Sequence, residues 1–381
     1  MNFNDFWRLA PVRRSLFAIF SVVFIAGCFG GAGKPAPTEL GANPALVGIR
    51  PAWTARIGEV KSFLSVNVSA QAVTVAATDG TVAAIDPATG RDLWRTRLTT
   101  PLLAGVGSDG RTAAVVTLEN DLVAIEGGKV LWRQKLSAQS FTAPLVAGKR
   151  VFVLGADRSV HAFDGQTGRR LWSQQRPGHP LVLRQAGTML PVGDTLVVGL
   201  SGRLVGMNPL NGSSRWEAAI STPRGTNEVE RLVDLVGDAS RVDDVVCARA
   251  FQAAVGCVNT TRGAVMWTRP ANGILGLDGD ARMVFGTESN GLVNAWQRTT
   301  GEPVWATDRL KYRDLTAPLV LGRAVVVGDG AGFVHLLSRE DGSLLARVAT
   351  DGSAIVATPV LAGNTLVVVS RNGGVFGFRP E

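Results

Sequence analysis

Short apolar runs alternate with turn residues along most of the chain, and residues 73–94 (VTVAATDGTVAAIDPATGRDLW) show the pattern in one unit. The apolar run 73–77 meets Asp79-Gly80, a dipeptide suited to a tight hairpin turn because both residues tolerate positive φ. A second apolar run leads into the sequence DPATG, whose Asp, Pro and Gly each favour a turn. Trp94 follows on the next strand. The pattern predicts three strands and two turns in this stretch, which leaves no room for a helix.

The same unit recurs, with a tryptophan four residues after the glycine of the turn. These tryptophans are Trp94, Trp132, Trp172, Trp216, Trp267 and Trp305, which lie 38, 40, 44, 51 and 38 residues apart. A further copy of the turn, SREDG, leads to Ala346 where the tryptophan is expected. A period near forty residues with about four strands per repeat is typical of a β-propeller. Because flat blades need a large side chain between them, we expect each tryptophan to pack at a boundary between two blades.

The two ends of the chain complement each other. Pro51-Ala52-Trp53 begins a strand with no hairpin partner before it, whereas residues 355–378 supply three strands and no fourth. We expect the N-terminal strand to complete the last blade, which closes the ring and hides two sheet edges. The sequence thus predicts an all-β fold, an eight-bladed β-propeller of four-stranded antiparallel blades over residues 51–381. A seven-bladed ring with one degenerate copy is the alternative.

Residues 1–27 have the features of an export signal peptide. Arg8, Arg13 and Arg14 precede an apolar stretch of about ten residues, which is too short to span a membrane. The stretch ends in the sequence IAGC, which resembles a bacterial lipobox, where the chain is cut before the cysteine and the thiol of Cys28 carries the lipid. An ordinary secretory leader with an incidental cysteine is the alternative.

The residues after this cysteine bear on where the protein is held. Gly30, rather than Asp, stands two residues after it, so the lipobox resemblance implies sorting to the outer membrane. Residues 28–50 are rich in Gly, Pro and Ala and show no periodicity, which predicts a flexible tether between the lipidated cysteine and the propeller. A lipid would attach to the membrane a domain that has no spanning helix.

Charge and histidine content argue against several function classes. The net charge is +8, but no basic run with interleaved aromatic residues occurs, which disfavours nucleic-acid binding. His161 and His335 share one column of the repeat with Ala, Val and Phe, so we interpret that column as a packing position. His179 stands alone between Gly and Pro, and no metal-ligand spacing of Cys or His is present. We expect neither a metal nor a cofactor.

Two further cysteines, Cys247 and Cys257, flank a predicted β-hairpin in the fifth repeat. If the turn is a three-residue loop around residues 251–253, the two cysteines lie opposite each other across the hairpin. Export would place them in an oxidising compartment, where a disulfide can form. Two buried thiols that pack as small hydrophobic side chains are the alternative, and the sequence leaves both open.

Two insertions interrupt the repeat, at residues 176–190 and 220–244. In propellers such loops carry binding residues on a rigid scaffold. Surface insertions without a binding role are the alternative.

These features together resemble the BamB family of lipoprotein propellers, which belong to the outer-membrane β-barrel assembly (BAM) machinery. The resemblance is carried by the lipobox, the tether, the eight repeats and the insertion motifs PLVLR, at residues 180–184, and EVERLVD, at residues 228–234. It implies partner-binding roles for Leu181, Leu183, Arg184 and Asp234. Val236 departs from a second acidic position of the family, which removes one polar contact from the expected set.

The resemblance also implies a function. The protein would be a non-enzymatic scaffold, monomeric within the BAM complex and held at the periplasmic face of the outer membrane. It would bind a POTRA domain of BamA and help to deliver unfolded barrel precursors. The competing classes are a pyrroloquinoline-quinone dehydrogenase, whose blade motif is similar, and an envelope sensor or polysaccharide-binding propeller. The absence of a vicinal cysteine pair argues against the dehydrogenase.

Overall fold

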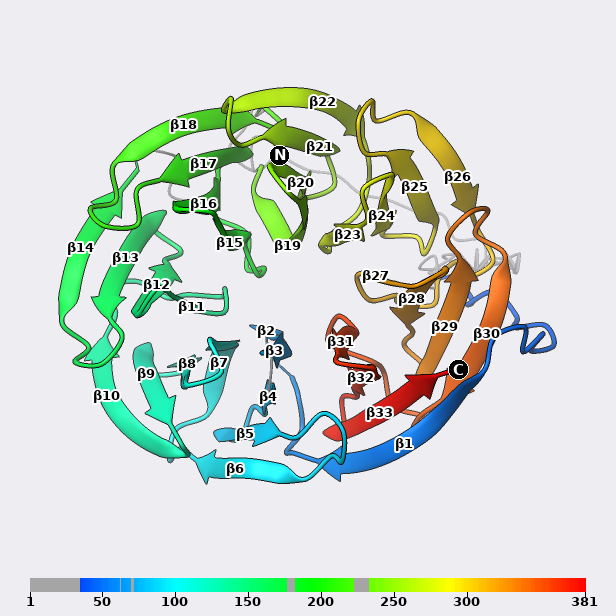
Figure 1. Ribbon diagram of the computed structural model, residues 1–381, viewed down its shortest axis with the longest axis horizontal. Coiled ribbons are helices and arrows are strands. Elements are labelled where there is room, and N and C mark those ends of the chain that lie inside the picture. The colour runs from blue at the N-terminus through cyan, green and yellow to red at the C-terminus, as the bar shows by residue number, and fades with distance from the viewer. Residues whose placement is uncertain (1–34, 62, 70–71, 177–181, 223–232) are drawn as a thin grey trace, which may run out of the picture. The chain divides into compact units, whose positions relative to one another are not determined.

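The repeated strand–turn units close into a ring of eight blades around a central axis (Figure 1). The computed structural model describes residues 35–381 except 62, 70–71, 177–181 and 223–232. Pro37–Glu381 form one compact unit, and its described residues contain 33 strands. None of the described residues belongs to a helix that is long and apolar enough to cross a membrane. The predicted all-β, eight-bladed propeller is confirmed, and the seven-bladed alternative is wrong.

Blades 1 to 4 each contain four antiparallel strands that run from the central axis to the rim. Blade 1 consists of β3 (Asn67–Val68), β4 (Val73–Ala76), β5 (Thr81–Ile85) and β6 (Asp92–Arg97). Blade 2 consists of β7 (Leu102–Ser108), β8 (Thr112–Thr117), β9 (Asp121–Glu126) and β10 (Lys129–Lys135), with β2 (Phe63–Leu64) added parallel to β7. Blade 3 consists of β11 (Leu145–Ala147), β12 (Arg150–Leu154), β13 (Ser159–Asp164) and β14 (Arg170–Gln175). Blade 4 consists of β15 (Met189–Val192), β16 (Thr195–Leu200), β17 (Arg203–Met207) and β18 (Ser214–Ala219).

Blades 5 to 8 repeat this arrangement. Blade 5 consists of β19 (Leu235–Val242), β20 (Val245–Ala250), β21 (Ala254–Asn259) and β22 (Ala264–Pro270). Blade 6 consists of β23 (Leu277–Gly279), β24 (Met283–Thr287), β25 (Val293–Gln297) and β26 (Pro303–Thr307). Blade 7 consists of β27 (Leu319–Leu321), β28 (Ala324–Gly328), β29 (Phe333–Ser338) and β30 (Leu344–Ala349). Blade 8 consists of β31 (Val360–Ala362), β32 (Thr365–Val369), β33 (Gly374–Pro380) and β1 (Ile49–Arg56).

The N-terminal strand closes the ring as the sequence predicts. Strand β1 pairs antiparallel with β33, from Ile49 opposite Pro380 to Arg56 opposite Gly374. It starts two residues earlier than predicted, since Ile49 and Arg50 already belong to it. The last three strands of the chain therefore gain their fourth strand from its beginning, and β1 covers the outer edge of β33.

Each blade boundary but one is made by a tryptophan seated on a glycine of the next blade. The pairs are Trp53 on Gly90, Trp94 on Gly128, Trp132 on Gly168, Trp172 on Gly212, Trp216 on Gly263, Trp267 on Gly301 and Trp305 on Gly342. The glycines all have positive φ, and at each of them except Gly128 a Cβ atom would come within 3 Å of the tryptophan side chain. In most pairs the indole N–H also donates to a backbone carbonyl of the same turn, as Trp267 does to Arg298 at 2.7 Å. Each repeat thus supplies one side of two contacts. Its tryptophan packs on the next blade, and its turn glycine, four residues before the tryptophan position, receives the tryptophan of the preceding blade.

The boundary between blades 7 and 8 has neither half. Blade 7 carries Ala346 at the tryptophan position. Blade 8 has no turn that could receive a tryptophan, because the two ends of the chain meet there. The amide of Glu381 donates to the carbonyl of Gly48 at 2.9 Å. Ala346 instead packs in an apolar cluster that includes Phe378, Val47 and Ile49. The missing tryptophan of the seventh repeat is therefore a consequence of where the ring is closed.

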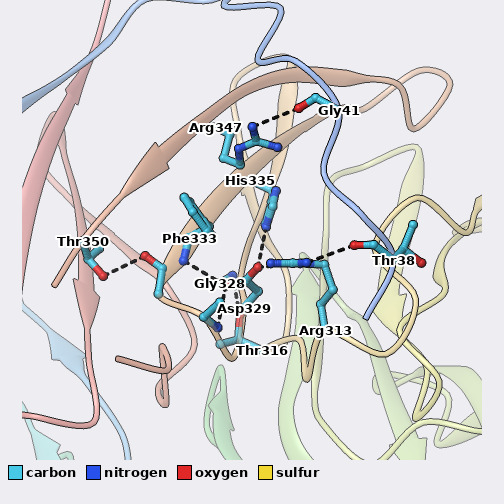
Figure 2. A network of polar contacts seen from close by, with 12 residues as sticks. Thr38, Gly41, Arg313, Thr316, Gly328, Asp329, Phe333, His335, Arg347 and Thr350 are labelled. Atoms are coloured by element: carbon cyan, nitrogen blue, oxygen red, sulfur yellow. Dashed lines mark hydrogen bonds and ion pairs between the residues drawn. The ribbon is translucent and has the colours of Figure 1, made fainter. Parts of the chain in front are cut away.

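Residues 37–48, which we call the strap, lie along blades 6 and 7 before β1 begins (Figure 2). The Thr38 amide donates to the carbonyl of Lys311 at 3.0 Å, and Leu40 packs in the apolar cluster between blades 6 and 7. Asn43 exchanges two hydrogen bonds with the backbone of Arg347, each 2.9 Å long. The prediction of a flexible tether over residues 28–50 is therefore wrong for the strap. Its composition is that of a linker, but several of its backbone groups form hydrogen bonds with blade 7 and with the segment that precedes β27.

A buried ion network holds the strap in place. Asp329 accepts from Arg313 at 2.8 Å and from His335 at 3.0 Å, and the carboxylate and imidazole are fully buried. Arg313 also donates to the carbonyl of Thr38 at 3.0 Å, which ties the network to the strap. The column of His335 was interpreted as a packing position. The side chain is buried as that interpretation requires, but it is hydrogen-bonded as well.

We predict that Gly301→Ala destabilises the ring more than Gly322→Ala. Both glycines have positive φ, which costs an L-residue about 1–2 kcal/mol. A Cβ on Gly301 would also lie 2.4 Å from the Trp267 indole, whereas nothing lies within 4 Å of one on Gly322. Overpacking adds about 1–3 kcal/mol. Equal midpoints of urea unfolding for the two variants would contradict the seating of the indole on the glycine.

We also predict that part of the stability is lost on acidification through His335. Burial lowers the pKa of His335 despite its contact with Asp329, so the unfolded chain takes up the proton first, near pH 6.5. Stability is therefore fully present above this value and falls as pH drops below it. His335→Gln keeps an N–H donor for Asp329 but does not titrate. The variant should show a flatter dependence of unfolding free energy on pH between about 7 and 5, and identical slopes would contradict the assignment.

Candidate partner-binding site

Residues 182–188, which belong to the first predicted insertion, cross the inner end of blade 4 and connect blades 3 and 5. The amide of Gly187 donates to the hydroxyl of Thr142 in the segment before β11, at 2.9 Å. On the other side, the amide of Gly237 in β19 donates to the carbonyl of Ala186 at 2.8 Å, and the hydroxyl of Thr188 donates to the carbonyl of Gly237 at 2.8 Å. Residues 186–188 of this segment are thus held by hydrogen bonds from two sides, one from the segment before β11 and two from β19.

Asp234 joins the two insertions directly. Its carboxylate accepts from the backbone amide of Leu183 at 2.9 Å, across 51 residues of sequence. The carbonyl of Asp234 accepts from the amide of Phe251 at 3.0 Å, so the residue is fixed on the β20–β21 hairpin as well. Asp234 is half-buried, and its side chain positions the segment that carries Leu183 and Arg184.

Arg184 is exposed and stands over an aromatic ring. Its guanidinium carbon lies 5.6 Å from the ring centroid of Phe141, a cation–π distance. The ring restricts the long side chain to one region of the surface. Phe141 was not singled out from the sequence, because it lies in a connection between blades whose only signal is the sequence FTAP before β11.

The structure brings together three of the four predicted partner-binding residues: Leu183, Arg184 and Asp234. Leu181 lies outside the described residues. Leu183 is half-buried rather than fully exposed, because it lines a small cavity beneath the segment. Val236, which stands in place of a family acidic residue, is buried in β19 and offers no polar group to a partner.

The second predicted insertion is shorter than its expected bounds of 220–244. Residues 235–242 are β19, the innermost strand of blade 5, and residues 223–232 lie outside the described part of the chain. The strand was missed because its sequence, LVGDASRV, is bent by an irregularity between Val236 and Ser240 that breaks the alternation of apolar residues. Asp234 therefore stands at the point where the insertion enters the blade.

The cavity beside Leu183 and Asp234 is too small for a cofactor. Its volume is about 50 Å³, and it lies against Phe141, Leu200 and Arg158. Pockets for drug-sized ligands are several hundred Å³, whereas about 10–15 Å³ holds one water molecule. This cavity can take a protein side chain or a few waters, while a wider cavity of about 740 Å³ lies on the other side of Leu183, against Val233 and Phe251.

The central axis holds a larger space of about 410 Å³, lined by the innermost strands of the blades. Asp238 is the single charged side chain among the described residues that line it. Burial in the channel raises the pKa of Asp238. Among the described residues, no group of three or more His, Cys, Asp and Glu side chains could hold a metal ion. One carboxylate does not supply the oxygen ligands that a calcium–quinone site needs.

Cys247 and Cys257 lie directly opposite each other in β20 and β21, across the three-residue loop 251–253. The structure joins them in a disulfide, and both residues are fully buried. The guanidinium of Arg298 donates to the sulfur of Cys247 at 3.3 Å. The bond lies inside blade 5 and supports the hairpin on which Asp234 is fixed.

Comparison with known proteins decides the family. The family model described as outer membrane protein assembly factor BamB matches residues 78–307. An outer membrane protein assembly factor BamB from Burkholderia pseudomallei is 41% identical over 350 residues, which cover 91% of this chain and 92% of the relative. The BamB of Bordetella pertussis is 34% identical and covers 98% of this chain and 97% of the relative. The chain belongs to the BamB family.

Solved structures agree on the fold. The crystal structure of BamB from Moraxella catarrhalis matches with a TM-score of 0.79 and 24% identity, over 87% of this chain and all of that one. A quinohemoprotein alcohol dehydrogenase from Comamonas testosteroni matches with a TM-score of 0.67 and 15% identity, over 87% of this chain and 76% of that one. Proteins of the BamB family therefore share this propeller architecture with redox enzymes.

The hydrogen bond from Leu183 to Asp234 gives a prediction that needs no partner. Asp234→Ala removes the acceptor, so the amide of Leu183 should exchange its hydrogen with solvent at least about tenfold faster. Asp234→Asn keeps a carbonyl oxygen at the same place and should retain most of the protection. Hydrogen exchange followed by mass spectrometry on peptides covering residues 182–188 measures both variants. Unchanged exchange in Asp234→Ala would show that the carboxylate does not hold the segment.

Proposed function

We propose that this protein is a non-enzymatic scaffold of outer-membrane protein assembly, which binds a POTRA domain of BamA through the surface formed by Leu181, Leu183, Arg184 and Asp234. The observation that carries the proposal is the hydrogen bond from the amide of Leu183 to Asp234, which makes one surface of two insertions 51 residues apart. Membership of the BamB family supports the assembly role. Unfolded precursors of outer-membrane proteins are the further partners.

The chemistry of the surface fits a protein partner. A leucine at the rim of a small cavity offers apolar area, and Arg184 beside it offers charge-assisted hydrogen bonds. Arginine and buried apolar anchors are typical of the energetic centres of interfaces. Because the segment is held in place before the partner arrives, little ordering entropy is lost on binding.

The sequence supports a lipid anchor at Cys28, which would hold the protein at the periplasmic face of the outer membrane, with residues 1–27 as the signal peptide. Cys28 lies outside the described residues. The strap shortens the connection, since the propeller unit begins at Pro37. On this proposal the domains are residues 1–27, a lipidated linker that ends near residue 36, and a propeller with its strap from residue 37 onward.

The partner surface is tested by titration against the isolated POTRA domains of BamA. Leu181→Ala combined with Leu183→Ala, or Arg184→Ala alone, should weaken binding by about 2 kcal/mol or more, as truncation of interface centres does. Leu210→Ala is the matched control, since Leu210 is an exposed leucine in a turn at the rim of blade 4. Circular dichroism confirms that each variant is folded. Undiminished binding by the folded double-leucine variant would show that these loops are surface insertions without a partner role.

The anchor is tested separately. Cys28→Ala should remove the site of lipid attachment and leave the chain uncleaved or soluble, because no other segment is proposed to hold the mature chain at the bilayer. Growth with radiolabelled palmitate measures the modification. Label that persists in the Cys28→Ala protein would refute the lipobox assignment and leave the partner surface untouched.

A further inference from the structure

The strap carries the N-terminal part of the chain from one face of the ring to the other. At its C-terminal end the amide of Leu46 donates to the carbonyl of Leu345 at 2.7 Å, just after the turn of blade 7 that receives Trp305. At its N-terminal end the amide of Thr38 donates to the carbonyl of Lys311, in the connection between β26 and β27. The strap thus runs along the outer edge of β30 and begins at the face where blade 6 connects to blade 7.

This face also carries the proposed partner surface. In every blade the fourth strand connects to the next blade at the same face of the ring, because all eight blades have the same antiparallel order. The segment 182–188, Asp234 and residues 308–318 all belong to such connections. We call this side the partner face. The chain that leads to the strap therefore enters the propeller at the face on which Leu183 and Arg184 lie.

Strand β1 begins at the opposite face, which carries the turns that receive the tryptophans. Arg50 in β1 pairs with Arg379, whose guanidinium donates to the carbonyl of Ala88 in such a turn of blade 1, at 3.0 Å. Without the strap, the N-terminal chain would leave the ring at this opposite face, where residue 49 follows Cys28 by 21 positions. With the strap it leaves at the partner face, where Thr38 follows Cys28 by only ten.

The chain between Cys28 and the strap is short compared with the thickness of the ring. Its sequence is rich in Gly, Ala and Pro, and ten residues of such composition are expected to span about 18 Å on average. Strand β30 has six residues, which extend over about 20 Å. A linker of this average span does not return along β30 to the opposite face. A lipid on Cys28 would therefore be held on the partner side of the ring.

The edge of the ring at which the strap begins has side chains suited to a lipid surface. Arg309 and Tyr312 are exposed, and the amide of Tyr312 donates to the carbonyl of Asn290 at 2.9 Å, which fixes the backbone there. Lys311 pairs with Asp308 at 3.3 Å, whereas Arg309 has no ion-pair or hydrogen-bond partner for its side chain among the described residues. Tyrosine is enriched where membranes meet water, and arginine pairs with lipid phosphates.

We propose that the strap holds the propeller with its partner face towards the bilayer, so that Arg309 and Tyr312 contact phospholipid head groups. The inference rests on the proposed lipid anchor at Cys28 and adds the point at which the anchored chain leaves the ring. The bilayer is the occupant of this edge, because the chain that leads to the lipid ends beside it. A partner bound at Leu183 and Arg184 is then approached from the membrane side.

Energy transfer to the bilayer tests the orientation. The lipidated protein is placed, without BamA, in vesicles of phosphatidylethanolamine and phosphatidylglycerol whose head groups carry an acceptor dye. A donor dye is attached through Ser289→Cys, in the β24–β25 turn at the partner face, or through Ala281→Cys, in the β23–β24 turn at the opposite face of the same blade. Both positions are exposed, and Cys247 and Cys257 are joined in a buried disulfide that does not take up the dye. Transfer should be at least about twofold more efficient from position 289, because the length of a strand separates the two turns.

Release of the strap should remove this difference between the two faces. Leu40→Asp places a charge in the apolar cluster between blades 6 and 7, and Asn43→Ala removes both hydrogen bonds to Arg347. In the double variant the chain is free as far as β1, so the lipid can reach either face. Glu39→Ala is the matched control, since Glu39 is an exposed residue of the strap, and it should change nothing. Circular dichroism confirms that each variant is folded.

The contact with head groups is tested by Arg309→Glu. This variant should lower transfer from position 289 in the phosphatidylglycerol vesicles and leave it unchanged in vesicles of phosphatidylcholine alone, because the reversed charge is repelled by anionic lipid. An unchanged signal in both kinds of vesicle would overturn the contact. Equal transfer from the two faces of the wild type would overturn the orientation, and so would a difference that survives release of the strap.

The mass of the purified protein is measured first. A chain without lipid would refute the anchor at Cys28 and this inference with it, but it would leave the BamA surface untouched. A failed titration with the POTRA domains would in turn leave the vesicle results standing, because these vesicles contain no BamA.

Discussion

The seating of a tryptophan on the turn glycine of the next blade is the contact on which this ring depends. It couples two sequence features that lie in different repeats: an indole on the outermost strand and a glycine with positive φ in the neighbouring turn. Because blades 1 to 6 each supply an indole on one side and a glycine on the other, the repeats stack in one direction. The ring closes when the same contact forms between Trp53 of blade 8 and Gly90 of blade 1.

The exception to this contact shapes the rest of the molecule. Blade 8 is built from both ends of the chain, so it has no turn to receive a tryptophan, and blade 7 carries Ala346 instead. The N-terminal segment then runs over this weaker part of the ring, where the buried Arg313, Asp329 and His335 hold it. The closure of the ring by the N-terminal strand thus accounts for the missing tryptophan of blade 7 and for the position of the strap.

The fold could be predicted because the repeat is visible in the sequence. The strap and the candidate site depend on contacts between residues far apart in the sequence, and these contacts could not be predicted. The repeated tryptophans and Ala346, together with Trp53 and the unpaired strands near the C-terminus, were enough to predict both the number of blades and their closure. The strap was missed because its Gly- and Pro-rich composition is that of a linker, and the ion network that binds it is far away in sequence. In the candidate site, Asp234 was identified by family resemblance, but its hydrogen bond to Leu183 spans 51 residues and has no local signal. Phe141 was missed for the same reason.

The central claim is that the propeller serves as a scaffold within the outer-membrane assembly machinery. Co-purification of the full-length protein from detergent-extracted membranes tests it most directly. The account predicts that a barrel-assembly complex containing BamA is recovered with the wild-type protein, and that BamA is lost when Leu183 and Arg184 are both replaced by Ala. Recovery of the protein without BamA, together with dye-linked alcohol oxidation on addition of a quinone cofactor, would contradict it.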